Sequence, residues 1–177
     1  MPFFTHLRKR RPDWLSLVLI GLIVYLWFRP PATVARLDQP VANAGVSLLS
    51  GQTVNLHALR GKVVLVNFWA TWCPYCRHEM PAMQAFYQDH HDQGFDILAL
   101  SSGEDAATVR QFMVKEGYTF PAGLATAEVA NAFGRPTSVP TSFIIDRQGH
   151  LRHKITGQVH YARLQELAEP LLRERPP

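Results

Sequence analysis

The sequence predicts one α/β domain that follows a single apolar segment near the N-terminus. Runs of β-branched and aromatic residues, such as 62–69 (KVVLVNFW) and 95–100 (FDILAL), are typical of strands buried on both faces of a sheet. Helical stretches that end at glycine separate such runs. This alternation favours parallel β/α units, and residues 45–177 suffice for one such domain.

The elements are expected in the following order. Residues 46–56 resemble a small hairpin that introduces the domain. The strand at 62–69 is followed by a helix from Pro74 to about Gln93, because proline is tolerated in a first helical turn. After the strand at 95–100 we expect helices at 106–116 and 128–133, a strand at 141–145, a turn at 146–149, a strand at 151–155 and a helix at 161–173. The domain therefore closes with an antiparallel hairpin and a helix.

The apolar segment 14–28 (WLSLVLIGLIVYLWF) carries no charge and is expected to be a transmembrane signal anchor. As a helix it measures roughly 22 Å against a hydrocarbon core of about 30 Å, a mismatch that flanking arginines and terminal tryptophans can accommodate. A cleaved signal peptide and a buried core helix are the alternatives. The one small-x-small site, at 42–44, lies far from the apolar segment, which disfavours cleavage.

The charge distribution predicts how the chain is oriented. The basic cluster Arg8–Arg11 precedes the apolar segment, so residues 1–13 are expected in the cytoplasm and the domain in the periplasm or outside the cell. Residues 29–44, with prolines at 30, 31 and 40, are expected to form a tether. From residue 30 onward, 13 basic residues balance 13 acidic ones, so the pI of about 9.3 does not indicate a nucleic-acid partner.

The chain has only two cysteines, and they form the motif Trp72-Cys73-Pro74-Tyr75-Cys76 at the start of the first long helix. A disulfide that encloses two residues constrains the unfolded chain little, which favours catalysis over a structural bridge. A zinc site would need a second pair of ligands. At a helix N-terminus the dipole favours a thiolate, so Cys73 is the expected nucleophile and Cys76 the residue that resolves the mixed disulfide.

Residues 64–81 (VLVNFWATWCPYCRHEMP) resemble the active-site stretch of TlpA/ResA/DsbE-type thioredoxin-like proteins, which are membrane-tethered, extracytoplasmic disulfide reductases. The likeness continues through 102–104, 112–121 and 138–146, and covers most of residues 45–172. It implies a thioredoxin-like fold, with a central mixed sheet flanked by helices, an N-terminal β-hairpin and a central insertion, on one transmembrane helix. It also implies reduction of disulfides in exported proteins, such as apocytochrome c during cytochrome c maturation or copper-resistance partners.

The same resemblance assigns roles to particular residues. Pro140 lies where the family has a cis-proline, in a loop that faces the disulfide and binds substrate backbone together with Val139. Glu79 matches an acidic residue that moves protons near the cysteines, although an ordinary surface glutamate is the alternative. Asn67 replaces a buried aspartate of cytoplasmic thioredoxins, which increases the weight of Glu79. The expected substrate-binding residues are Trp72, Pro74, Tyr75, Val139 and Pro140.

No cofactor and no bound metal are expected, and the expected electron donor is a membrane-embedded thiol protein of the DsbD/CcdA type. The dipeptide Pro74-Tyr75 is typical of glutaredoxins, so the redox potential stays open. A copper-binding chaperone is the alternative function, suggested by the two cysteines together with histidines such as His90-His91. A non-redox adaptor with the same fold is a third hypothesis.

Overall fold

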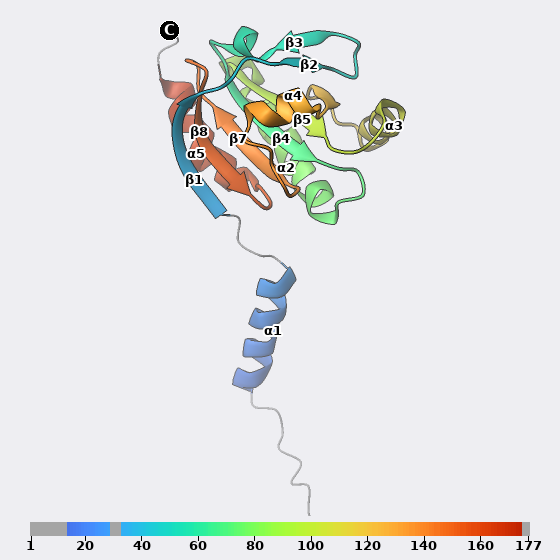
Figure 1. Cartoon of the computed structure of the whole chain (residues 1–177). Coiled ribbons are helices and arrows are strands. Elements are labelled where there is room, and N and C mark those ends of the chain that lie inside the picture. The colour runs from blue at the N-terminus through green and yellow to red at the C-terminus, as the bar shows by residue number, and fades with distance from the viewer. Residues whose placement is uncertain (1–13, 29–32, 175–177) are drawn as a thin grey trace, which may run out of the picture. The chain divides into compact units, whose positions relative to one another are not determined.

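The computed structural model of the chain describes residues 14–28 and 33–174 (Figure 1). The chain divides into two units near residue 31. The first contains helix α1 (Trp14–Phe28), which has the same bounds as the predicted anchor. Among the described residues, no helix combines the length and the apolarity that crossing a membrane requires. The predicted basic terminus, 1–13, and the start of the predicted tether, 29–32, lie outside the described residues.

The second unit is built on a six-stranded mixed sheet with the order β1-β8-β7-β4-β5-β6. Strand β4 lies inside the sheet, parallel to β5 and antiparallel to β7. On one side β6 pairs in parallel with β5. On the other side β8 pairs antiparallel with β7, and β1 pairs antiparallel with β8. The strands are β1 (Thr33–Pro40), β4 (Val63–Trp69), β5 (Phe95–Ser101), β6 (Ala122–Leu124), β7 (Thr141–Ile145) and β8 (His150–Thr156). A separate hairpin pairs β2 (Gly45–Ser47) with β3 (Thr53–Asn55), which confirms the predicted N-terminal hairpin.

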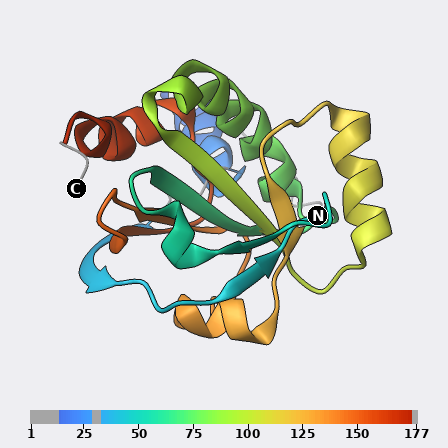
Figure 2. The same cartoon turned by 90° about the horizontal axis from the view of Figure 1, so that it is seen from above.

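Helices cover both faces of this sheet (Figure 2). They are α2 (Pro74–His90), α3 (Ala106–Glu116), α4 (Ala127–Ala132) and α5 (Tyr161–Arg173), with short 3-10 helices η1 (Leu56–Leu59) and η2 (His91–Gln93). Alternate residues of β4 enter two different cores. Val63, Leu65 and Trp69 pack with α2, α3 and α5, whereas Val64, Val66 and Phe68 pack with α4 and the hairpin. The sequence prediction of a strand buried on both faces is therefore confirmed.

The predicted tether 29–44 is wrong from residue 33 onward. Residues 33–40 form the edge strand β1, which pairs with β8 from Thr33 opposite Thr156 to Pro40 opposite His150. Proline is tolerated there because an edge strand need not donate every N–H to a neighbour. Val41 and Ala44 then enter the core with 3% and 2% of their surface exposed. Composition suggested a tether because the pairing partner of β1 lies far away in the sequence.

Local signals explain why the helices begin and end where they do. Asp105 accepts hydrogen bonds from the N–H groups of Ala107 and Thr108, each at 2.9 Å, and so caps the start of α3. Gly117 ends the same helix with φ of 74°, a conformation that favours glycine. Both ends of α3 agree with the prediction from sequence. The short strand β6 and helix η1 were not predicted, because three or four residues carry too little periodicity.

Candidate active site

The two cysteines lie where the central strand β4 passes into helix α2. Cys73 is the N-cap of α2 and Pro74 occupies its first turn, as predicted. Cys73 and Cys76 form a disulfide with their Cα atoms 5.3 Å apart, and the N–H of Cys76 donates to Cys73 Sγ at 3.2 Å. Cys73 keeps 3% of its surface exposed and Cys76 none. In the reduced protein, Cys73 Sγ would therefore carry its negative charge against a helix N-terminus.

The loop before β7 faces this disulfide. The Val139–Pro140 peptide bond is cis, as the resemblance implied, and the Val139 carbonyl oxygen lies 3.9 Å from Cys73 Sγ. β7 is the antiparallel neighbour of β4, so the fold brings the loop next to the cysteines although it lies far along the chain.

An open groove runs past the disulfide between these two loops. Its lining is formed by Phe68, Trp72, Cys73, Pro74, Tyr75, Ser102, Pro136, Thr137, Ser138 and Val139. Four of the five predicted substrate-binding residues are in this set, while the fifth, Pro140, is buried and does not line the groove. Trp72 is 68% exposed and Tyr75 41%, an unusual exposure for large aromatic side chains. A groove of this kind can receive an extended segment of a protein substrate.

Glu79 is completely buried, so the alternative of a surface glutamate is wrong. Its Oε1 accepts a hydrogen bond from Asn67 Nδ2 at 2.8 Å, and its Oε2 accepts one from the Val159 N–H at 2.8 Å. Burial raises the pKa of Glu79 to about 8, although the hydrogen bonds from Val159 and Asn67 act in the opposite direction. Glu79 lies one helical turn after Cys76 on α2, so it is well placed to exchange a proton near neutral pH.

Two further contributors to the site were not assigned a role from the sequence. The first is Glu104, whose carboxylate accepts hydrogen bonds from the Thr71 N–H at 2.8 Å and from the Ser101 hydroxyl at 2.6 Å. It also accepts from the Thr71 hydroxyl. These contacts hold the loop that carries Trp72 and Cys73. The tripeptide Ser102-Gly103-Glu104 was part of the resemblance, but its spacing alone gives no indication of this contact.

The second contributor is the segment Gly157–Val159 between β8 and α5. The Gly157 N–H donates to the Pro140 carbonyl at 3.0 Å, and the Gln158 side chain donates to the Tyr75 carbonyl at 3.1 Å. With the Val159 contact to Glu79, three consecutive residues touch the proline loop, the cysteine motif and the buried acid. No sequence signal indicated this, because the contacts use mainly backbone groups.

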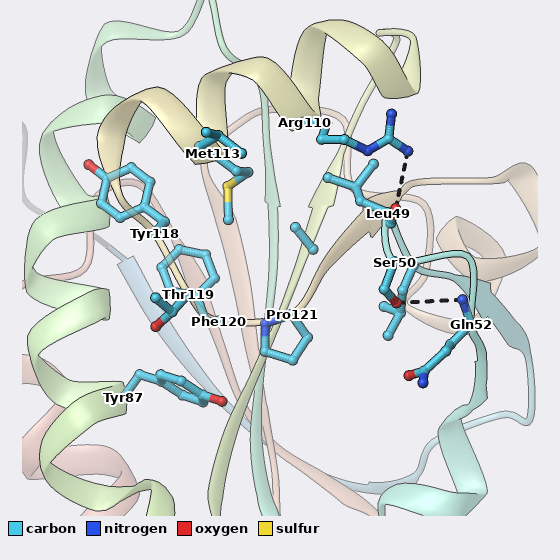
Figure 3. Close-up of a pocket in the computed structure, with 13 residues that line it drawn as sticks. Leu49, Ser50, Gln52, Tyr87, Arg110, Met113, Tyr118, Thr119, Phe120 and Pro121 are labelled. Atoms are coloured by element: carbon cyan, nitrogen blue, oxygen red, sulfur yellow. Dashed lines mark hydrogen bonds between the residues drawn. The ribbon is translucent and has the colours of Figure 1, made fainter.

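A separate pocket lies where α3, the 118–121 segment and the loop between β2 and β3 meet (Figure 3). Tyr87, Met113 and Tyr118 contribute to its wall, and at its edge the Arg110 guanidinium donates to the Leu49 carbonyl at 3.1 Å. Neither the cysteines nor Glu79 line this pocket, so we assign it no part in thiol chemistry.

The histidines that suggested copper lie elsewhere. His90 is stacked on Phe86 with ring centroids 4.1 Å apart, and its Nδ1 lies 3.2 Å from the Phe86 carbonyl oxygen. Within residues 14–28 and 33–174, no group of three or more histidine, cysteine or acidic side chains is arranged to hold a metal ion.

Comparison with known proteins decides the family. The model of the family Redoxin matches residues 37–168. The chain belongs to the Redoxin family. It is 32% identical over 170 residues to the thiol-disulfide oxidoreductase ResA of Halalkalibacterium halodurans, covering 91% of this chain and 96% of that protein. It is 36% identical over 144 residues to ResA of Geobacillus thermodenitrificans, covering 81% and 82%.

Solved structures agree with this assignment. A thiol:disulfide interchange protein of the thioredoxin family from Chlorobium tepidum superposes with a TM-score of 0.71 and 31% identity, covering 78% of this chain and 98% of that one. The predicted thioredoxin-like fold and the resemblance to ResA-type proteins are thus confirmed. Together with the paired cysteines, these relatives make this redoxin a thiol-disulfide oxidoreductase.

Proposed function

We propose that this oxidoreductase reduces disulfides in exported proteins, outside the cytoplasm and attached to the cytoplasmic membrane. The observation that carries the proposal is the cysteine pair beside an open groove, with exposed Trp72 and Tyr75 on one side and Val139 on the other. An enclosed pocket would suit a small thiol. An open aromatic groove suits a polypeptide, because aromatic side chains give large contact area and backbone groups give hydrogen bonds.

The proposed reaction has two exchange steps. The Cys73 thiolate attacks one sulfur of the substrate disulfide, so that a mixed disulfide forms and the other substrate sulfur leaves as a thiolate. The Cys76 thiolate then attacks Cys73 Sγ and displaces the second substrate sulfur. Two electrons pass to the substrate, which ends as a dithiol, and the protein ends with the Cys73–Cys76 disulfide. The two substrate thiolates take up two protons, which the enzyme thiols have released.

Glu79 is proposed to accept the proton of the Cys76 thiol and so to generate the second thiolate. Cys76 is fully buried, so its proton has no direct path to water, and a carboxyl one turn away is a suitable acceptor. With a pKa of about 8, Glu79 is mostly protonated at neutral pH, and its ionised fraction is the form that accepts the Cys76 proton.

Membrane attachment is proposed through the segment 14–28. Its support is an uncharged helix of fifteen residues that follows a basic cluster, the pattern of a signal anchor with a cytoplasmic N-terminus. A membrane-embedded thiol donor of the DsbD/CcdA type would then re-reduce Cys73 and Cys76, and a common membrane raises the effective concentration of the two partners. Apocytochrome c and copper-resistance proteins are the proposed classes of substrate.

A trapping experiment tests the exchange reaction. Cys76→Ser should accumulate mixed disulfides with exported proteins, while Cys73→Ser should trap nothing and reduce no insulin. Adducts formed through Cys76 in the Cys73→Ser protein would reverse the roles of the two cysteines. Copper binding to the reduced protein without insulin reduction would favour the chaperone alternative, and normal function without either cysteine would favour the adaptor.

A reporter fusion and thiol alkylation test the compartment and the direction of electron flow. An enzyme reporter that works only after export, fused after Pro177, should be active. In acid-quenched cells the cysteines should be mostly dithiol and should become oxidised when the membrane donor is lost. A cytoplasmic reporter signal would contradict the location, and a fully oxidised protein that ignores the donor would make it an oxidase.

A further inference from the structure

Asn67 and Ser142 form a buried polar cluster with Glu79. Asn67 lies in the middle of β4, directly opposite Ser142 of β7, and neither side chain is exposed. Asn67 Nδ2 lies 2.8 Å from Glu79 Oε1 and 2.9 Å from Ser142 Oγ, so it donates both of its protons. Asn67 Oδ1 is also buried, but it has no hydrogen-bond partner among the described residues. A buried acceptor without a partner is uncommon in a folded protein and calls for an explanation.

The observed arrangement favours the ionised form of Glu79. Each carboxylate oxygen faces a donor, Asn67 Nδ2 on one side and the Val159 N–H on the other. A proton on the lone pair that faces either donor would therefore point at an N–H group. The backbone N–H of Val159 cannot become an acceptor. The Asn67 side chain can become an acceptor. Its carbonyl oxygen and its NH₂ group are both bonded to Cγ, so a half-turn of the amide exchanges their positions.

We propose that Asn67 is a positioning residue whose side-chain amide turns over when Glu79 takes up a proton, with Ser142 reversing its hydroxyl. After the turn, Asn67 Oδ1 accepts the acid proton of Glu79 and the hydroxyl proton of Ser142. When Glu79 is ionised, Asn67 Nδ2 donates to Glu79 Oε1 and to Ser142 Oγ. Either state has matched partners towards Glu79 and Ser142, because a primary amide and a hydroxyl can each donate and accept. On its other side the Asn67 amide has no partner among the described residues in either state. The importance of the Asn67 turn for catalysis rests on the proposed function of Glu79, whereas the turn itself does not depend on that function.

The groups around Glu79 make its titration simple to follow in the oxidised protein. Glu79 faces the Asn67 amide of β4 and the Val159 N–H of the segment after β8, and Ser142 of β7 lies behind Asn67. None of these groups titrates. On its own helix Cys76 lies one turn away and is held in the disulfide. The pKa of about 8 arises from burial against two hydrogen bonds, with no contribution from a charged side chain of the described residues. Both states of Glu79 are thus accessible near neutral pH.

NMR of the oxidised full-length protein tests the proposal without requiring any exchange activity. The carboxyl ¹³C signal of Glu79 reports its ionisation. Above its midpoint, NOEs should connect the Asn67 amide protons to the Ser142 β-protons, and these NOEs should disappear below the same midpoint. NOEs that persist unchanged through the Glu79 transition would refute the turn. A Glu79 that stays in one state between about pH 5 and pH 10 would refute it too.

Glu79→Gln provides the matched control. The Val159 N–H requires an acceptor, so the glutamine oxygen must face Val159 and its NH₂ group must face Asn67. Asn67 is then expected to be held in the turned orientation at every pH, without the NOEs to Ser142. An Asn67 in this variant that shows the high-pH pattern would overturn the proposal.

Asn67→Leu keeps the branching of the side chain at Cγ, but leucine can neither donate nor accept a hydrogen bond. The ionised form of Glu79 loses more than the acid form, because a hydrogen bond to a charged group is the stronger one. The proton affinity of Glu79 should therefore rise tenfold or more, and an unchanged affinity would contradict the role of Asn67. If Asn67→Leu does not fold, the NOE measurements on the other two proteins still decide. If the Asn67 amide turns in a protein that shows no exchange activity, this proposal holds although the proposed function fails.

Discussion

Replacing Glu79 by glutamine keeps the size of the side chain but removes the buried carboxyl, and the change in stability should depend strongly on pH. Glu79 is fully buried, and burial raises its pKa from the ordinary 4.5 to about 8. The folded protein therefore keeps this proton up to about pH 8, whereas the unfolded chain releases it near pH 4.5. Between these values the folded state binds one more proton, so raising the pH favours unfolding.

The size of the effect follows from this interval. Each pH unit within it lowers the free energy of unfolding by about 1.36 kcal/mol. The contribution is fully present below pH 4.5 and is lost as the pH rises to about 8, which amounts to roughly 5 kcal/mol over the whole interval. Between pH 5 and pH 7.5, Glu79→Gln should therefore gain about 3 kcal/mol relative to the unchanged protein. Other titrating groups affect both proteins alike and cancel in this difference.

Urea unfolding of the two oxidised proteins at several pH values measures this difference directly. The disulfide stays intact in both, so the thiols do not titrate. The two curves of unfolding free energy against pH should diverge from about pH 5 and run parallel again above about pH 8. Parallel curves across the whole range would mean that Glu79 ionises in the folded protein as it does in water, and would refute the reasoning from burial.

Three further substitutions test the parts of the site separately. Trp72→Ala should change the free energy of unfolding by less than about 0.5 kcal/mol, because Trp72 is 68% exposed, while KM for a protein disulfide rises; an unchanged KM would remove Trp72 from the substrate groove. Glu104→Gln should cost about 1–3 kcal/mol in urea unfolding and slow exchange, because Thr71 and Ser101 lose a charged acceptor; full stability would show that these hydrogen bonds do not hold the loop. Asp105→Ala should lower the urea midpoint of unfolding through loss of the α3 cap and leave insulin reduction unchanged; a fall in activity would connect α3 to the active site.

The sequence alone determined the elements whose signals are local. The end of α3 followed from its terminal glycine, and the predicted bounds of α3 and α5, 106–116 and 161–173, agree with the structure. The position of the cysteines at a strand-to-helix junction was equally readable, because a buried β-branched run ends just before Cys73 and Pro74 suits a first turn. These features depend on residues that are close along the chain.

Only the tertiary structure decided the features that depend on distant partners. Residues 33–40 became a strand because β8 offers them an edge, and composition alone indicated a tether. The burial of Glu79 was not readable either, because a charged residue on a helix is usually exposed. Its partners come from β4 and from the segment after β8, which meet α2 only in the folded domain. The pKa of Glu79 is thus a property of the fold, because burial removes water from the carboxyl and distant groups replace it with a fixed set of hydrogen bonds.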